Sequence, residues 1–142
     1  MRFSNRLFIF LLLSTLLFSV NARAQTAPTG SVLWSDPATW PDNKVPAAGD
    51  RVVIESDKEV ILDVSPPALG GLTINGKLSF SDNSDLELST EWILVFGELE
   101  IGTESNPHTS KATITLTDNN ENEQLMGMGD RGIMLSGGTH AH

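Results

Sequence analysis

Ile74-Asn-Gly-Lys-Leu-Ser-Phe80 returns 21 residues later as Val95-Phe-Gly-Glu-Leu-Glu-Ile101. Both phrases read apolar-x-Gly-x-Leu-x-apolar, an alternation that predicts β-strand. A pattern that recurs every 20 to 30 residues or so is typical of stacked coils, none of which can bury its apolar face alone. The two phrases therefore predict an all-β domain with short strands, of the β-solenoid or parallel β-helix kind. We expect it to be the N-terminal part of a longer β-helix.

Both phrases share a glycine, Gly76 in the first and Gly97 in the second, which falls in mid-strand. Glycine normally weakens a strand interior, so its recurrence at one phase predicts a sharp corner or a close approach of backbone between coils. Gly49, in a turn, and Gly102, at the start of a loop, are also expected to be structural glycines.

Further runs of alternating or β-branched residues flank the repeat, at 51–55, 59–63, 85–89, 112–117 and 132–136. A tight reversal at Ser56-Asp57-Lys58 is expected to return the chain from the first run to the second. No segment after residue 24 has apolar residues at the i, i+3, i+4, i+7 spacing of a helix. The chain after residue 24 is therefore predicted to be nearly all β.

The first 24 residues have the pattern of a cleaved signal peptide. Basic Arg2 and Arg6 precede a 14-residue, largely apolar run, and Ala22-Arg23-Ala24 is a small-x-small cleavage site, so cleavage is predicted between Ala24 and Gln25. A membrane span needs about 20 apolar residues, more than this run supplies. We therefore predict a secreted or periplasmic protein with no transmembrane span once the signal is removed.

The predicted organisation has four parts: a signal peptide at 1–24, a linker at 25–31, a β domain at 32–138, and a ragged or truncated C-terminal end at 139–142. Cleavage removes three of the nine basic residues and none of the 18 acidic ones, which leaves six against 18 and a net charge of −12. So acidic a domain is a poor partner for nucleic acid, whose phosphates need Lys and Arg. The chain contains no cysteine, so stability must come from a packed core.

The sequence offers no strong catalytic motif. Nucleophilic catalysis by Cys or by a Gly-x-Ser-x-Gly elbow is excluded, because neither occurs. Near pairs of carboxylates that a glycosidase could use are Asp82 with Asp85, Glu98 with Glu100, and Asp118 with Glu121, but so acidic a chain produces such pairs by chance. We expect no catalytic residues in this chain.

Metal and ligand candidates are few. The oxygen-rich segments 81–85 and 118–123 make calcium conceivable, yet they lack the EF-hand pattern, and no cofactor is predicted. His108, His140 and His142 are weak candidates for a transition-metal site. Trp34, Trp40 and Trp92 are the candidate ligand-binding aromatics, against an alternative role in the core. Trp40, set among turn residues, is expected to be the most exposed.

Over residues 32 to 138 the chain resembles the G-eight domain family, an all-β extracellular domain found in hyaluronan-binding and hyaluronidase-like cell-surface proteins and in fibrocystin. The phrases that carry the resemblance are Trp40 through Val45-Pro46-x-x-Gly49-Asp50-x-Val52-x-Ile54, Val60-x-Leu62-Asp63, Leu69 to Phe80, Ile93 to Gly102, Ala112-x-Ile114-x-Leu116, and Gly127 to Gly138. The resemblance implies an all-β domain that leads into a parallel β-helix, with a role in binding or processing extracellular polysaccharide.

The function predicted from residues and resemblance together is a secreted, non-catalytic module for extracellular glycan or cell-surface interaction. The negative charge favours a neutral glycan or a surface protein as partner over direct binding of an acidic polymer. Two alternatives remain: an N-terminal fragment of a polysaccharide-degrading, hyaluronidase-like β-helix enzyme, and a purely structural cap.

Overall fold

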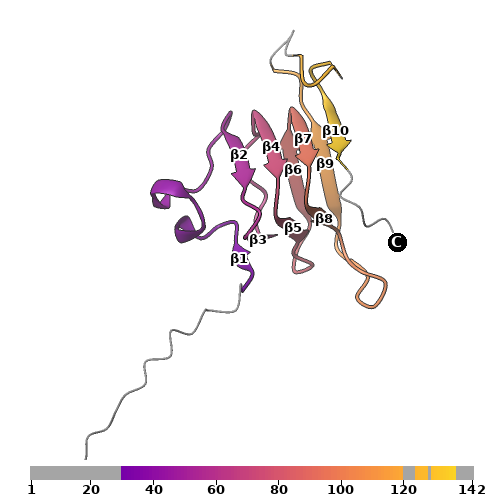
Figure 1. The fold of residues 1–142 in the computed structure, drawn as a ribbon. Helices are drawn as coiled ribbons and strands as arrows, with labels where there is room; N and C mark the ends of the chain where they lie inside the picture. Colours follow the sequence, from indigo (N-terminus) through magenta and orange to yellow (C-terminus); the bar gives the residue numbers. More distant parts are fainter. Residues whose placement is uncertain (1–29, 120–123, 128, 137–142) are drawn as a thin grey trace, which may run out of the picture.

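The computed structural model describes residues 30–119, 124–127 and 129–136, and this part of the chain is all-β apart from two short 3-10 helices (Figure 1). The elements are β1 (Val32–Leu33), η1 (Pro37–Thr39), η2 (Pro41–Asn43), β2 (Arg51–Ile54), β3 (Glu59–Leu62), β4 (Gly71–Ile74), β5 (Lys77–Phe80), β6 (Leu86–Thr90), β7 (Trp92–Val95), β8 (Glu98–Glu100), β9 (Ala112–Leu116) and β10 (Gly132–Leu135).

The described strands form three sheets, and every named pair of strands is parallel. The strand orders are β1-β3-β5-β8 (sheet A), β10-β7-β4-β2 (sheet B) and β6-β9 (sheet C). From β4 onward the chain visits sheets B, A and C in turn, so that β7, β8, β9 and β10 each lie beside their counterpart from the coil before (Figure 1). This arrangement fits a short parallel β-solenoid, and the all-β fold class expected from the sequence is confirmed.

The 21-residue repeat of the sequence matches the offset between residues that pair in neighbouring coils. Ile74 pairs with Val95 in sheet B, and Leu78 pairs with Leu99 in sheet A. Each seven-residue phrase is nevertheless two strands rather than one, because the chain turns a corner at Asn75-Gly76 and again at Phe96-Gly97. The apolar residues on both sides of each corner still point inward, since each sheet presents one face to the same core.

The turn at 56–58 is also a corner, and the expectation of a reversal there is wrong. The Lys58 N–H donates to the Glu55 carbonyl at 3.0 Å, which closes a tight turn. The strands on either side do not pair with each other: β2 pairs with β4, and β3 pairs with β5. Periodicity locates such strands but does not choose between a hairpin and a coil, because both satisfy the same alternation.

The core is a set of apolar columns that run through the stacked coils. One column contains Val52, Leu72 and Ile93, which are neighbours in register and all buried. A second column is formed by the core-facing residues two positions further along the same strands, Ile54, Ile74 and Val95. Burying one such side chain contributes about 1.5–3 kcal/mol relative to leaving it exposed, so the columns supply much of the stability.

The 3-10 helices lie beside β2 at one end of the stacked strands (Figure 1), and Trp34 and Trp40 belong to the buried core. The Trp34 and Trp40 rings pack edge to face with centroids 4.7 Å apart, and the Trp40 indole N–H donates to the Trp34 carbonyl at 2.8 Å. Asp36 caps η1 by accepting a hydrogen bond from the Ala38 N–H at 2.9 Å. The Trp34 indole nitrogen, by contrast, is buried without a hydrogen-bond partner among the described residues, so the pair closes this end of the core mainly through its ring packing.

The last described strand has no neighbour on its outer side in the described part of the chain. Ile133 pairs with Ile93 and Leu135 with Val95, so both occupy core positions of their coil. Ile133 is 41% exposed and Leu135 is 75% exposed, whereas Ile93 is fully buried. The stacking of coils, rather than the identity of each residue, therefore decides what is buried.

Candidate functional site

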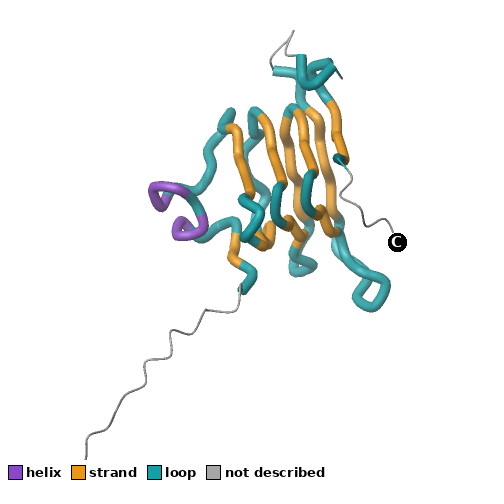
Figure 2. The backbone as a smooth tube through the Cα atoms, in the orientation of Figure 1, coloured by secondary structure: helices purple, strands orange, loops and turns teal. Residues whose placement is uncertain are grey.

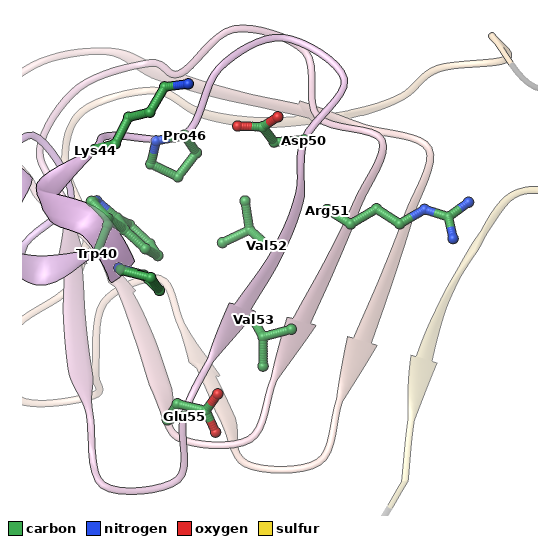
Figure 3. A pocket seen from close by; sticks show the side chains of 9 residues that line it. Trp40, Lys44, Pro46, Asp50, Arg51, Val52, Val53 and Glu55 are labelled. Atoms are coloured by element: carbon green, nitrogen blue, oxygen red, sulfur yellow. The ribbon is translucent and has the colours of Figure 1, made fainter.

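A surface hollow lies between β2 and the loop that precedes it (Figure 3). We call it the Trp40 cleft; it has a volume of about 320 Å³. Its lining consists of Trp40, Pro41, Lys44, Pro46, Asp50, Arg51, Val52, Val53 and Glu55. Lys44, Pro46 and Asp50 lie toward one end and Glu55 toward the other (Figure 3). Val52 and Val53 lie between them on β2, and we call these two residues the floor of the cleft.

The structure corrects the expectation that Trp40 is exposed. Its side chain lines the cleft but is only 7% exposed, because its ring packs on Trp34. Trp34 is completely buried, and Trp92 is 6% exposed, with its ring lying directly over Gly71. None of the three therefore offers an open ring face for stacking, and a ligand-binding role for them stays a prediction.

The apolar floor of the Trp40 cleft is bordered by charges of both signs. Val53 is 47% exposed, because it occupies an outward-facing position of β2 between buried Val52 and buried Ile54. Basic Lys44 and Arg51 line the cleft together with acidic Asp50 and Glu55. Asp50 accepts a hydrogen bond from the Ala47 N–H at 2.8 Å. An apolar patch with a mixed polar rim is the anatomy of a protein-interaction surface.

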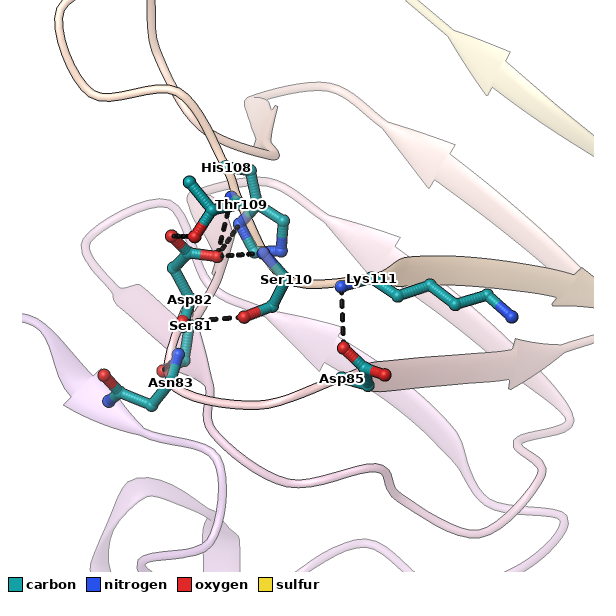
Figure 4. A network of polar contacts seen from close by, with 8 residues as sticks. All are labelled: Ser81, Asp82, Asn83, Asp85, His108, Thr109, Ser110 and Lys111. Carbon is teal, nitrogen blue, oxygen red and sulfur yellow. Dashed lines mark hydrogen bonds and ion pairs between the residues drawn. The ribbon is translucent and has the colours of Figure 1, made fainter.

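A second site lies where the turn at 81–85 meets the loop between β8 and β9, which extends away from the stacked strands (Figure 2, Figure 4). The Asp82 carboxylate accepts hydrogen bonds from the Thr109 N–H at 2.8 Å, the Thr109 hydroxyl at 2.7 Å and the Ser110 N–H at 2.6 Å. The Ser110 hydroxyl donates to the Asp82 carbonyl at 2.9 Å. One carboxylate thus fastens the loop to the coil before it, an arrangement that we call the Asp82 clamp.

These donors change the acidity of Asp82. Hydrogen bonds from the Ser110 N–H and then from the Thr109 hydroxyl hold the pKa of the Asp82 carboxyl well below its usual range, because they favour the charged form. Asp85 repeats the arrangement more simply, accepting one hydrogen bond from the Lys111 N–H at 2.9 Å. Both acids therefore serve to hold the loop in place.

Asp82→Asn is expected to lower the free energy of unfolding at pH 7, because the amide cannot accept all the bonds that the carboxylate accepts. A lowered folded pKa gives stability that is fully present above the ordinary Asp value of about 3.9 and is lost as pH falls through the folded pKa. The difference in free energy of unfolding between wild type and variant, measured by urea titration at several pH values, should therefore narrow only below about pH 4. Asp57→Asn, at an exposed position, is the control; a gap that is constant across the acid range would contradict the assignment.

The other carboxylate pairs named from the sequence are held by basic side chains. Lys77 lies 2.8 Å from Glu100 and 3.4 Å from Glu98. The bond to Glu100, ahead of the opposing effect of burial, raises the Lys77 pKa. Asp118 forms an ion pair with Arg131 at 3.1 Å, while Glu121 lies outside the described residues.

The four glycines expected to be structural occupy two kinds of position. Gly49 and Gly102 have positive φ, at 81° and 72°. Gly76 and Gly97 sit at the corners, where an added Cβ would collide with backbone carbonyl oxygens of the coil before: those of Glu55 and Lys58 at Gly76, and those of Gly76 and Asn75 at Gly97.

The remaining predicted site residues divide by location. His108 lies beside Asp82, with its Nδ1 3.5 Å from the Asp82 Oδ1. His140, His142 and the predicted cleavage site at Ala24 and Gln25 lie outside the described residues. Within the described ranges, no group of three or more His, Asp or Glu side chains is arranged to hold a metal, and no helix is long and apolar enough to cross a membrane.

Sequence reasoning missed the two features that the structure brings forward, the floor of the Trp40 cleft and the Asp82 clamp. Asp82 and Thr109 are 27 residues apart, and no local pattern links them. The available signal was the polar composition of both segments, which is equally typical of ordinary turns.

Stacked parallel sheets, closed at one end by an aromatic pair and carrying surface sites on their outer faces, define a small all-β module. The chain belongs to the G8 domain family: a model of the G8 domain matches residues 39–140. The resemblance to the G-eight family seen in the sequence is confirmed.

Known relatives agree with this assignment. The chain is 41% identical over 85 residues to human Fibrocystin-L and 40% identical over 86 residues to mouse Fibrocystin, each match covering 58% of this chain. It is 34% identical over 109 residues, or 75% of its length, to dog Fibrocystin. These matches cover only 2–3% of the relatives' own lengths. No solved structure matches the chain.

Proposed function

We propose that this chain is a secreted, non-catalytic G8 module for extracellular glycan or cell-surface interaction. Membership of the G8 family and the fibrocystin relatives support an extracellular location. The predicted signal peptide is consistent with the same location. A surface protein is the partner that the Trp40 cleft suits best.

The observation that carries the proposal is the Trp40 cleft. Its floor exposes Val53, and its rim has Lys44 and Arg51, two of the six basic residues that would remain after signal cleavage. In an acidic domain, local cations beside an apolar floor allow contact with a protein segment of mixed charge. The engagement of Asp82, Glu98 and Glu100 in hydrogen bonds and ion pairs with the chain's own residues supports a non-catalytic role.

Val53→Asp is expected to weaken binding to the cell surface at least about tenfold, because a charge would replace the exposed apolar floor of the contact. The measurement is the binding of labelled full-length protein, as exported, to cells of the producing organism before and after treatment with protease or glycosidase. Loss after protease identifies a protein partner, and loss after glycosidase identifies a glycan.

Val64→Asp is the matched control, because Val64 is 40% exposed but does not line the Trp40 cleft. Equal binding by wild type and both variants would remove the cleft from the proposal. Absence of binding to any treated or untreated surface would favour the purely structural cap. Release of sugar from polysaccharide by the wild type would favour the enzyme alternative.

A further inference from the structure

A polar groove crosses the outer face of sheet A at a distance from the Trp40 cleft. Its floor is a row of three residues in register: Ile61 on β3 pairs with Ser79 on β5, which pairs with Glu100 on β8. Neighbouring strands lie about 4.8 Å apart, so these side chains form a continuous row across three coils. We call this feature the Ser79 groove.

Two loops wall the Ser79 groove. One is the turn at 81–83, which follows β5, and the other is the loop between β8 and β9, which contributes Gly102, Thr103, Asn106 and His108. The hollow between them has a volume of about 250 Å³. Because Asp82 binds Thr109 and Ser110, the two walls are fastened together (Figure 4). The groove is therefore built by the fold before any ligand arrives.

The groove presents the chemistry that recognises sugar hydroxyls. Hydroxyl groups come from Ser79 and Thr103, side-chain amides from Asn83 and Asn106, and a carboxylate from Glu100. Hydroxyls and amides both donate and accept hydrogen bonds, and a carboxylate accepts them from vicinal hydroxyls. Ile61 adds an apolar surface against which the C–H face of a sugar ring can lie.

One polar atom at this site is left without a partner. The His108 side chain is 8% exposed, and its buried Nε2 has no hydrogen-bond partner among the described residues. An unsatisfied buried polar atom is costly. It belongs to a residue that lines the groove, although the atom itself is not exposed to the groove.

Charge selects the class of sugar. None of the described residues that line the groove is Lys or Arg, and Glu100 and Asp82 are both carboxylates. Lys77 lies outside the lining and is already bound to Glu100 and Glu98. A uronate or sulfated sugar would meet acidic groups with no cation available to pair with it, so a neutral sugar fits better.

We propose that the Ser79 groove binds a neutral saccharide unit, recognised through the hydroxyl, amide and carboxylate groups of Ser79, Asn106 and Glu100. This inference rests on the proposed extracellular interaction role and extends it to a second surface with a defined ligand class.

The test is a titration of ¹⁵N-labelled full-length protein with glucose and N-acetylglucosamine as neutral probes and glucuronic acid as the acidic probe. We expect a neutral probe to shift the amide signals of Ser79, Glu100 and residues 102–108, with a dissociation constant on the order of 1 mM. Glucuronic acid should bind at least about tenfold more weakly. Equal or tighter binding of glucuronic acid, shifts centred elsewhere, or no shift with either neutral probe would overturn the proposal.

Glu100→Gln and Asn106→Ala are expected to weaken binding of the neutral probe by about fivefold or more. Glu98→Gln is the matched control, because Glu98 also binds Lys77 but does not line the groove. Thermal melts of each variant exclude unfolding as the cause. Weakening by Glu98→Gln equal to that by Glu100→Gln would show that the ion pair, and not the groove, matters, and would refute the assignment.

Val53→Asp separates this inference from the function proposed above. If Val53→Asp abolishes binding to cells but leaves the sugar-induced changes in the amide signals intact, both the cleft and the groove are supported as binding surfaces. If binding to cells depends on Val53 but no sugar changes the amide signals, only the proposal for the groove is overturned. Sugar shifts without cell binding overturn the proposed role of the cleft and leave the groove standing.

Discussion

Gly97→Ala is expected to destabilise the protein by about 3 kcal/mol or more, a large part of the 5–15 kcal/mol that typically holds a domain folded. The added Cβ would enter the space of the Gly76 and Asn75 carbonyl oxygens. The backbone on both sides of this contact is held by hydrogen bonds: the Gly76 carbonyl accepts the Glu98 N–H at 2.8 Å, and the Gly97 N–H donates to the Ile74 carbonyl at 2.9 Å. Relief therefore requires the coils to separate at the corner, which breaks hydrogen bonds of both sheets.

The measurement is urea unfolding of Gly97→Ala beside Gly132→Ala. No described atom lies within 4 Å of a Cβ built on Gly132, which is also in a strand of sheet B. The control should change the free energy of unfolding by less than about 0.5 kcal/mol. Similar losses at both positions would mean that the corner is not tightly stacked.

Ile93→Ala is expected to cost about 2–5 kcal/mol, because it opens a cavity in the middle of an apolar column. Ile93 is fully buried between Leu72 and Ile133 in sheet B. The neighbouring coils cannot collapse into the space, since their spacing is set by the backbone hydrogen bonds between strands.

Ile133→Ala is the matched control for this second prediction. The two isoleucines are partners in register, yet Ile133 is 41% exposed. Its truncation should cost less than about 1 kcal/mol, because only part of the side chain leaves an apolar contact. Comparable losses at the two positions would mean that Ile133 is covered in solution as completely as Ile93.

The surface proposals depend on the same architecture. Val53 in the Trp40 cleft and Glu100 and Asn106 in the Ser79 groove lie outside the buried core. Substitutions there can alter binding while the core columns keep the fold, which makes Val53, Glu100 and Asn106 informative positions for testing function.

Much of the fold was predictable because its causes are local. Alternation marked strands that the structure places within a residue or two of the expected ends, such as β2 at 51–54 and β9 at 112–116. The 21-residue repeat predicted the register that joins Ile74 to Val95. The pairing partner of β3 was not predictable in this way, because alternation says which face of a strand is buried and not which strand lies beside it.

The sites were much less predictable. Trp40 was expected to be exposed from its turn-rich surroundings, but its ring is buried by Trp34, six residues earlier in the chain. The Asp82 clamp and the row formed by Ile61, Ser79 and Glu100 join residues from different coils. No short-range pattern encodes such meetings.

The sequence by itself thus determined that the chain forms short strands, that they repeat as coils, and which apolar residues face the core, because burial of alternate side chains is written in the order of residues. Only the tertiary structure decided that the corners at Gly76 and Gly97 stack backbone on backbone. It also decided that polar residues of separate coils meet as a clamp and a groove. The physical reason is that parallel stacking places residues from successive coils about 4.8 Å apart, a proximity that depends on the register of whole strands and not on any single phrase.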